Sequence, residues 1–284
     1  MILFADSGST KTNWLLYNTK TKEKLHFDTL GINPIIHHHQ EIIDIISKNE
    51  VLVSFGMQIK TIHFFGAGCS SIERNLLAKN AMHNIFPKAD IFIDEDMIGA
   101  GISICGNQKG IACILGTGSN SIYFDGQKWH ESNGGIGFIL GDEGSGSYFG
   151  KLILRDFLYQ KLPHEIEHEL KEKYHAEKNE IFHKTYKAIS PNRYLASFAP
   201  ILSTFRATEY VQLLLQEGFT SFIDYHVCCF PNYQEVPVGF VGSIASNFQS
   251  ELAQVAWNFD IQLGKFVSQP IEEVANHFIS ILEK

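Results

Sequence analysis

The sequence has few cysteines, and none of them is spaced to hold a metal. The five are Cys69, Cys105, Cys113, Cys228 and Cys229, with no C-x-x-C pair among them. An odd number of cysteines in a chain of 284 residues is typical of reduced thiols rather than of a disulfide framework. The pattern therefore argues against a disulfide scaffold and against a zinc ion or an iron–sulfur cluster held within one chain.

Basic charge and long apolar runs are also scarce. Lysine and arginine number 23 against 31 acidic residues, so the formal net charge is −8. Nucleic-acid binders need a clustered basic face, which makes a polyanionic partner a poor match. The apolar runs fall well short of the roughly 20 residues of a membrane helix, and the opening MILFADSG reads as a strand without a charged leader. We expect a cytoplasmic protein that binds neither nucleic acid nor membrane.

What the sequence does contain is enough apolar material for a packed core. Hydrophobic residues make up 44% of the chain, which suits one large or two modest domains. In the first third, alternating apolar residues indicate strands and helical spacing indicates helices. These patterns predict strands at 2–6, 13–18, 24–30, 61–68 and 90–94, and helices around 42–46, 71–86 and 97–105.

The rest of the chain begins in the same way. Two strands, 111–115 and 119–124, flank a Gly-Thr-Gly turn, and Asp125-Gly126 signals a hairpin. A helix-rich stretch with charged faces follows at roughly 145–215. After it, the pattern predicts a strand at 236–242, a helix after Ala245, a strand at 264–267 and a terminal helix whose first turn holds Pro270.

The two halves both read as βββαβα, which predicts an α/β protein of two duplicated lobes. The first lobe is expected at 1–105 and the second at 106–284, with the helical stretch at about 145–215 inserted in the second lobe. We expect the terminal helix to pack back on the first lobe.

A candidate phosphate-binding turn follows the first strand, in FADSGSTKTNW (residues 4–14). The turn from Ser7 to Thr12 has small residues whose N–H groups and hydroxyls can point at one anion. Asp6, at the end of the strand, can hold a hydrated Mg²⁺, because this ion prefers carboxylate, water and phosphate oxygens. An ordinary hairpin whose turn begins with an aspartate is the alternative interpretation.

Two further turns stand after strands of the second half. ILGTGSNS (114–121) repeats the strand–turn–strand design without a carboxylate, so it suits terminal phosphates, with Thr117 and backbone N–H groups donating. VGFVGSIASNF (238–248) places small residues at Gly242 and Ser243, where a flat adenine or a ribose can approach the backbone. Each turn by itself is also compatible with a plain tight turn.

Two acidic segments complete the set of motifs. In IFIDEDMIGAG (91–101), a strand delivers Asp94, Glu95 and Asp96 at its carboxyl end. A carboxylate beside two phosphate loops can accept the proton of a hydroxyl that attacks a phosphoryl group, although helix capping is the alternative. In LGDEGSGSYFG (140–150), Asp142 and Glu143 would repel a phosphate, so this glycine-rich loop needs a different role.

The order of these motifs along a duplicated fold resembles the sugar kinase/actin/Hsp70 superfamily of ATP-binding proteins, with its ribonuclease H-like, actin-like lobes. ADSGSTKT, GINP (31–34), the Asp96-to-Ala100 spacing, LGTGSNS and LGDEGSG resemble the N-acetylglucosamine kinase-like branch of the BadF/BadG-type ATPase family. The resemblance spans the whole chain, including the ending GKFVSQPIEEV.

The resemblance implies a homodimeric amino-sugar kinase that uses ATP and Mg²⁺ to phosphorylate N-acetylglucosamine at its 6-hydroxyl. It implies that Asp96 is the catalytic base and that Asp6 holds the metal. Sugar contacts are implied for Asn33, Asp96, Ser119 and Asp142. Contacts to ATP and its phosphates are implied for Ser7, Gly8, Ser9, Thr10, Lys11, Gly116, Thr117, Gly118, Ser119, Gly242 and Ser243.

The loop with two acids then has a chemical role, because an ionised carboxylate accepts charge-assisted hydrogen bonds from sugar hydroxyls. Asp142 is the residue expected to contact sugar, and Glu143 is expected to support the loop from behind. Capping of the helix that begins near Gly144 is the alternative role for Asp142.

Other functions stay open at this stage. One is a kinase for glucosamine or N-acetylmuramic acid. Another is an ATPase that activates a 2-hydroxyacyl-CoA dehydratase, which would need cysteines that bridge subunits through an iron–sulfur cluster. A third is a sugar sensor that keeps the fold without catalysis, which an intact Asp96 and both phosphate loops disfavour.

Overall fold

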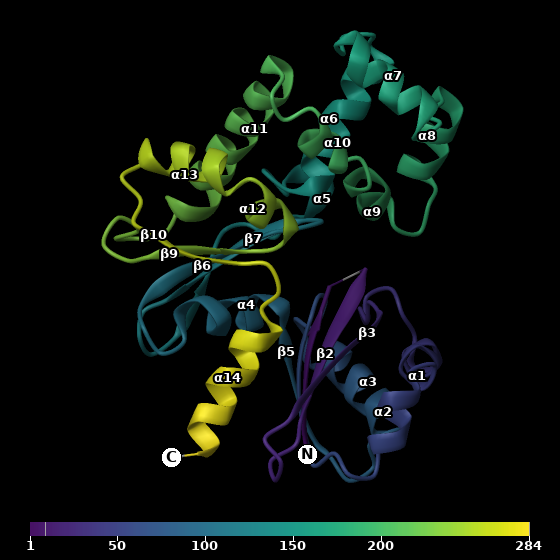
Figure 1. The fold of residues 1–284 in the computed structure, drawn as a ribbon, viewed down its shortest axis with the longest axis vertical. Coiled ribbons are helices and arrows are strands. Elements are labelled where there is room, and N and C mark those ends of the chain that lie inside the picture. Colours follow the sequence, from purple (N-terminus) through teal and green to yellow (C-terminus); the bar gives the residue numbers. More distant parts are fainter. Residues whose placement is uncertain (9, 284) are drawn as a thin grey trace. The chain divides into compact units, whose positions relative to one another are not determined.

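The computed structural model describes residues 1–8 and 10–283. They form two α/β lobes, each built on a mixed five-stranded sheet (Figure 1). One compact unit is Met1–Asn107 together with the C-terminal segment that begins at Gln269, and the other is Gln108–Ser268. The predicted architecture of two duplicated α/β lobes is confirmed.

The sheet of the first unit has the strand order β3-β2-β1-β4-β5. β1 pairs antiparallel with β2 and parallel with β4, and β4 pairs parallel with β5. Its strands are β1 (Ile2–Ser7), β2 (Lys11–Tyr17), β3 (Lys24–Leu30), β4 (Thr61–Gly66) and β5 (Asp90–Glu95), and its helices are α1 (His39–Ser47), α2 (Glu50–Phe55), α3 (Ile72–His83), α4 (Asp96–Cys105) and α14 (Ile271–Leu282).

Helices cover both faces of this sheet. Successive side chains of a strand point to opposite faces, so each strand contributes to two separate cores. Leu3 and Ala5 of β1 pack in one cluster with residues of α1 and α3. Ile2 and Phe4 pack in another cluster, with Ile271 of α14. Figure 1 shows α1, α2 and α3 on one side of the sheet and α4 and α14 on the other. An apolar strand such as ILFADS is therefore buried on both faces.

The sheet of the second unit repeats this arrangement. Its strand order is β10-β9-β6-β7-β8, which matches the first sheet when β6 to β10 take the places of β1 to β5. The strands are β6 (Gly110–Leu115), β7 (Ser119–Phe124), β8 (Trp129–Glu131), β9 (Val238–Val241) and β10 (Leu263–Val267). The helices are α5 (Gly137–Leu140), α6 (Gly146–Leu158), α7 (His164–Glu172), α8 (Lys178–Tyr186), α9 (Pro191–Ala196), α10 (Pro200–Thr204), α11 (Glu209–Phe222), the π-helix η1 (Ile223–Val227), α12 (Ser243–Asn247) and α13 (Gln249–Trp257).

Helices α5 to α11 and η1 lie between β8 and β9, where the first unit has only α1 and α2 between β3 and β4. They share one core with the sheet: Phe149 of α6 and Phe219 of α11 meet edge to face at 5.6 Å, in the same cluster as Phe240 of β9. Within the described ranges, every helix is too short or too polar to cross a bilayer.

Most differences from the predicted elements concern short segments. The periodicity of the sequence does not predict helix α2, because EVLVSF is only six residues long and rich in β-branched valine. Asn49 caps its start, since its side chain accepts hydrogen bonds from Val51 N and Leu52 N. The predicted hairpin at Asp125-Gly126 is confirmed, since β7 pairs antiparallel with β8 across it. The Asp125 carboxylate holds this turn by accepting from the backbone N–H groups of Gln127 and Lys128.

Candidate functional site

The candidate residues of the first unit gather at the carboxyl edge of its sheet. Strands β1, β4 and β5 run parallel, so their last residues meet at the same edge. Asp6 of β1 stands opposite Phe65 of β4, and Phe65 stands opposite Asp94 of β5. The chain passes from β5 directly into α4, whose first residue is Asp96. Topology thus brings together two acids that are ninety positions apart in the sequence.

The pKa values of both acids are higher than is usual for aspartate. Burial and then the charge of Asp96 raise the pKa of Asp6 to about 7, against a hydrogen bond from the Asn13 side chain that lowers it. Burial raises the pKa of Asp96 to about 6, although backbone N–H groups oppose the shift. One of them is Met97 N, which donates to Asp96 Oδ1 at 3.0 Å and orients the carboxylate. Carboxyl groups that titrate near neutral pH suit proton transfer.

Asp6 is the residue of this edge that could hold a Mg²⁺ ion. A carboxylate whose charge is unfavourable in the free protein gains from a bound cation, and Mg²⁺ prefers one or two carboxylates together with water and phosphate oxygens. Asn13 stands opposite Asp6 across the β1–β2 pair and holds its side chain. Sequence reasoning missed Asn13, although the antiparallel register of a short hairpin is the signal that could have identified it.

The turn between β1 and β2 divides into a buried and an exposed part. The Ser7 hydroxyl is fully buried, 2.6 Å from Thr12 Oγ1, and donates to Ile32 O at 2.9 Å. Gly8 N donates to Lys11 O at 3.0 Å, which closes the turn. Thr10 and Lys11 are exposed, with Lys11 Nζ 3.7 Å from Asp28 Oδ2. Ser9 lies outside the described residues.

Asn33 lies behind the same edge and is 6% exposed. Its Oδ1 accepts from Ile35 N at 2.9 Å, and its backbone N donates to His37 Nδ1 at 3.2 Å. The loop after β4 packs so closely on it that a Cβ on Gly68 would overlap Asn33 Oδ1. Next along this loop, burial and the charges of Asp96 and Glu95 raise the pKa of Cys69 to about 12. The Cys69 thiol is therefore kept protonated beside the acids.

In the second unit, the turn Gly116–Ser119 is held by the segment that follows α5. Gly146 N donates to Gly116 O at 2.8 Å, and Ser147 N donates to Thr117 O at 2.9 Å. The Asp142 carboxylate lies over the turn, because Ser119 N donates to Asp142 Oδ1 at 3.4 Å and a Cβ on Gly118 would be 2.8 Å from Asp142 Oδ2. The two motifs LGTGSNS and LGDEGSG therefore form one structure.

Asp142 is not the cap of the helix behind it. Helix α6 begins at Gly146, and its N-cap is Ser145, whose Oγ accepts from Tyr148 N at 3.2 Å. Asp142 instead has a left-handed backbone with φ +59°, a conformation that aspartate tolerates better than most residues. Burial raises the pKa of its carboxyl, and hydrogen bonds from Ser119 and Ser147 partly oppose the shift.

The sequence motifs predicted a ligand contact for the Ser119 hydroxyl and did not indicate His226 at all. The hydroxyl of Ser119 is already used, since it donates to Glu143 O at 2.8 Å. The carboxylate of Glu143 in turn lies 3.2 Å from Nε2 of His226, a buried residue that no motif indicated. It comes from the π-helix η1, about eighty positions along the chain.

Gly242 joins β9 to α12 in a conformation that requires glycine. Its φ is +113°, and an added Cβ would be 2.5 Å from the carbonyl oxygen of Leu115, at the end of β6. Ser243 is the first residue of α12. The turn Gly242-Ser243 and the turn after β6 are thus neighbours in the second unit.

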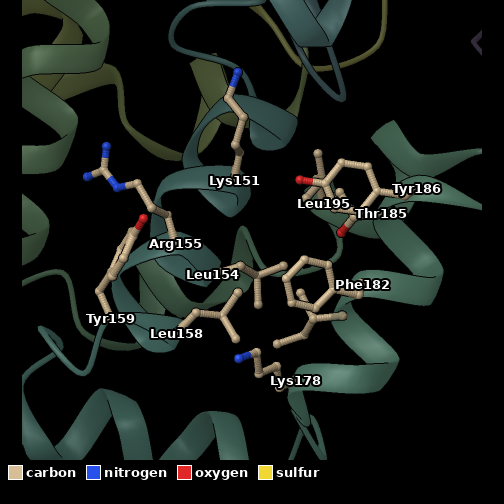
Figure 2. A pocket seen from close by; sticks show the side chains of 11 residues that line it. Lys151, Leu154, Arg155, Leu158, Tyr159, Lys178, Phe182, Thr185, Tyr186 and Leu195 are labelled. Carbon is tan, nitrogen blue, oxygen red and sulfur yellow. The ribbon is translucent and has the colours of Figure 1, made fainter.

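A separate cavity of about 440 Å³ lies between α6 and the α8–α9 segment of the second unit. Figure 2 shows Leu154 and Leu158 of α6 facing Phe182 of α8 across it. None of its 11 lining residues is a candidate residue from the sequence. Its wall is mainly apolar, with Lys151, Arg155 and Lys178 at the rim.

The chain is similar to proteins of solved structure. No family model and no curated protein matches the sequence. The solved structure of a "Putative N-acetylglucosamine Kinase" from Porphyromonas gingivalis is 34% identical, with a TM-score of 0.91, and the match covers 99% of each chain.

More distant structures share the fold. A "Putative N-acetylglucosamine Kinase" from Chromobacterium violaceum is 17% identical, with a TM-score of 0.68 over 97% of this chain and 98% of that one. A ROK family glucokinase from Streptomyces griseus, in complex with glucose and AMPPNP, is 12% identical, with a TM-score of 0.55 over 97% and 98% of the two chains.

The fold is therefore the actin-like ATPase fold of hexokinases and ROK kinases. Its duplicated sheets and the placement of turns at their carboxyl edges agree with that assignment. The 34% identity to the Porphyromonas gingivalis protein extends over nearly all of both chains. The chain belongs to the family of that protein, and it shares its fold with hexokinases and ROK kinases.

Proposed function

We propose that this protein transfers the γ-phosphoryl group of ATP to an amino sugar, N-acetylglucosamine at its 6-hydroxyl being the first candidate. The observation that carries the proposal is the 34% identity, over 99% of each chain, to a protein described as a putative N-acetylglucosamine kinase. The resemblance of GINP and LGDEGSG to the N-acetylglucosamine kinase-like branch of the BadF/BadG-type ATPases supports the same substrate class.

Asp96 is the residue we assign as general base. The attacking sugar hydroxyl must lose a proton as its bond to phosphorus forms, and a positioned carboxylate can take that proton. A pKa raised to about 6 leaves Asp96 mostly ionised at pH 7 while keeping it more basic than an ordinary aspartate. The hydrogen bond from Met97 N holds its orientation.

Within each unit, turns are assigned to the nucleotide. Gly8, Thr10 and Lys11 are proposed to contact phosphates in the first unit, with Ser7 contributing only through its backbone because its hydroxyl is bonded internally. Phosphate contacts in the second unit are assigned to the turn Gly116–Gly118, and the adenosine to Gly242 and Ser243. Asp6 would hold Mg²⁺, which supplies positive charge that neutralises the phosphates and the developing negative charge.

The sugar is assigned to Asn33 and Asp142, whose oxygens can accept hydrogen bonds from hydroxyls. Among the residues that the structure describes, the hydrogen bonds to the Asp142 carboxylate are long, at 3.4 Å from Ser119 N and 3.5 Å from Ser147 Oγ. Such a group has accepting capacity left for a ligand. Ser119 is proposed to act by fixing this carboxylate, because its own hydroxyl donates to Glu143 O.

The test is ADP release by the purified protein with Mg-ATP and a panel of N-acetylglucosamine, glucosamine, N-acetylmuramic acid and glucose. We expect ADP release with an amino sugar, a 6-phosphate product by NMR, and loss of turnover in Asp96→Asn. If none of these sugars stimulates ADP release above the level without sugar, the proposal is wrong. Size-exclusion chromatography with light scattering tests the expected homodimer in the same samples.

A further inference from the structure

His226 is a buried histidine that no sequence motif indicated. It is 2% exposed and lies in η1, which continues α11 with π-helical hydrogen bonding. Its ring stacks on Phe222 at 4.7 Å with planes 14° apart, and its backbone oxygen accepts a hydrogen bond from Ser121 Oγ at 2.5 Å. Both ring and backbone are thus held, and π-helical turns occur often at functional sites.

The ring meets the loop that carries Asp142. His226 Nε2 lies 3.2 Å from Oε2 of Glu143, whose side chain is 16% exposed. The backbone oxygen of Glu143 accepts from Ser119 Oγ at 2.8 Å, so this residue is tied at its side chain and at its main chain. Asp142, directly before it, has the left-handed backbone described above. A strained position of this kind persists only where the surroundings hold it.

The surroundings of the other ring nitrogen, Nδ1, favour one tautomer of the ring. Nδ1 of His226 is buried and has no hydrogen-bond partner among residues 1–8 and 10–283. Gly134 covers it so closely that a Cβ there would overlap Nδ1 and Cε1. A neutral ring with its proton on Nε2 donates to Glu143 and leaves a bare acceptor at Nδ1. The other tautomer, with its proton on Nδ1, would bury an unpaired N–H there and would have no donor at Nε2 for Glu143.

We propose that His226 is a positioning residue, which donates from Nε2 to Glu143 and so holds the Asp142 carboxylate over the turn Gly116–Ser119. The consequence for sugar binding rests on the proposed function. The alternative is a purely structural role, in which the His226 ring only packs against Phe222. The two roles differ in what a substitution must preserve: a donor at Nε2 in the first, and the ring volume in the second.

Two substitutions separate these roles. His226→Gln keeps an amide donor near the position of Nε2, whereas His226→Phe keeps the ring and removes the donor. We expect His226→Phe to raise the sugar KM about tenfold or more, because a hydrogen bond to a charged group is lost, with the KM for ATP little changed. His226→Gln should recover most of this loss. His168→Phe, an exposed histidine on α7, is the matched control and should behave as the unaltered protein.

A readout without turnover keeps this inference separate from the proposed function. Hydrogen–deuterium exchange of the segment 140–147 should be faster in His226→Phe than in His226→Gln, while exchange of the first unit should stay the same. Adding Glu143→Met, which has no acceptor oxygen, to His226→Phe should have little further effect, since both substitutions remove the same contact. If His226→Phe does not fold, the comparison of Glu143→Met and His226→Gln with the unaltered chain carries the test, and Glu143→Met should accelerate exchange at 140–147.

Two results would overturn the positioning role. One is unchanged exchange at 140–147 in a folded His226→Phe. The other is an equal loss in His226→Gln and His226→Phe, which would mean that ring shape alone matters. By contrast, a protein that phosphorylates no sugar but shows the expected exchange pattern would refute the proposed function and leave the positioning role standing.

Discussion

The carboxylates of Asp6 and Asp96 are electrostatically coupled across the carboxyl edge of one sheet. The charge of Asp96 is, after burial, the main cause that raises the pKa of Asp6 to about 7, and burial raises the pKa of Asp96 itself to about 6. Asp6 lies near the end of β1, Asp96 directly follows β5, and the single strand β4 separates these two strands. Two carboxyl groups tuned toward neutral pH at one edge are typical of acid–base and metal chemistry.

Replacing Asp96 tests the general base. Asp96→Asn should lower kcat by about 10²- to 10⁴-fold, which is the usual contribution of a general base, while ATP binding measured by calorimetry stays nearly unchanged. Asp94→Asn is the matched control, because Asp94 is an exposed acid near the end of β5, two positions before Asp96. Near-normal turnover in Asp96→Asn, or an equal loss in Asp94→Asn, would contradict the assignment.

The pH dependence of the reaction follows from the same group. The base must be ionised, and the pKa of Asp96 is about 6. The sugar kcat/KM at saturating Mg-ATP should therefore be level above pH 7 and fall below about pH 6, approaching a tenfold loss per pH unit as Asp96 becomes protonated. A profile that stays level down to pH 4.5 would show that no group with this pKa limits the reaction.

The ionised Asp6 carboxylate, which we propose as the Mg²⁺ ligand, should destabilise the folded protein when no Mg²⁺ is present. The pKa of Asp6 is about 7 when folded against 3.8 in its ordinary range, so the folded chain binds a proton more readily than the unfolded chain between these values. Stability should therefore fall as pH rises from 4 to 7. Without Mg²⁺, Asp6→Asn should be more stable than the unaltered protein at pH 8 by at least about 1 kcal/mol, given about 1.4 kcal/mol per pKa unit.

Urea unfolding at several pH values measures this effect. The gain in the free energy of unfolding should shrink as pH falls and vanish below about pH 3, where Asp6 is protonated in both states. The same variant should lose Mg-dependent turnover. An Asp6→Asn protein that is less stable than the unaltered one at pH 8 would show that Asp6 makes a favourable ionic contact instead.

Two glycines should respond differently to the same substitution. Gly242→Ala must fit a side chain at φ +113° and at 2.5 Å from Leu115 O, so we expect a loss of about 1–3 kcal/mol in the free energy of unfolding. Gly116→Ala meets nothing within 4 Å and should fold normally. If its turn contacts phosphate, Gly116→Ala should raise the ATP KM with stability unchanged. Equal stabilities of the two variants by thermal unfolding would contradict the argument for Gly242.

The loop LGDEGSG can be divided by two substitutions. Ser145→Ala removes the N-cap of α6 and should reduce stability by about 1 kcal/mol. Asp142→Asn leaves that cap in place, so it should chiefly raise the sugar KM. The paired measurements are unfolding free energy and sugar KM for each variant. An Asp142→Asn protein whose sugar KM is unchanged would remove Asp142 from the sugar contacts.

Much of the fold could be predicted because its signals are local. The strand ILFADS and the helix IEEVANHFISIL carry their own periodicity, and the Asp125-Gly126 hairpin is encoded in two residues. The short helix α2 could not be predicted in this way, since its stability comes from the Asn49 cap and from packing instead of from propensity. The motif LGDEGSG identified Asp142 and Glu143 as candidate residues, but it did not predict which residues they contact.

The duplicated α/β architecture, the order of its turns and the acids near the ends of its strands could be inferred from the amino-acid sequence, because each depends on residues close together in the chain. Three features became visible only in the folded chain: Asp96 raises the pKa of Asp6, Ser145 rather than Asp142 caps α6, and His226 contacts Glu143. Each of these depends on a particular side-chain position, and His226 and Glu143 are brought together from segments far apart in the sequence. Burial and hydrogen-bond geometry between such segments have no periodicity that a sequence can display.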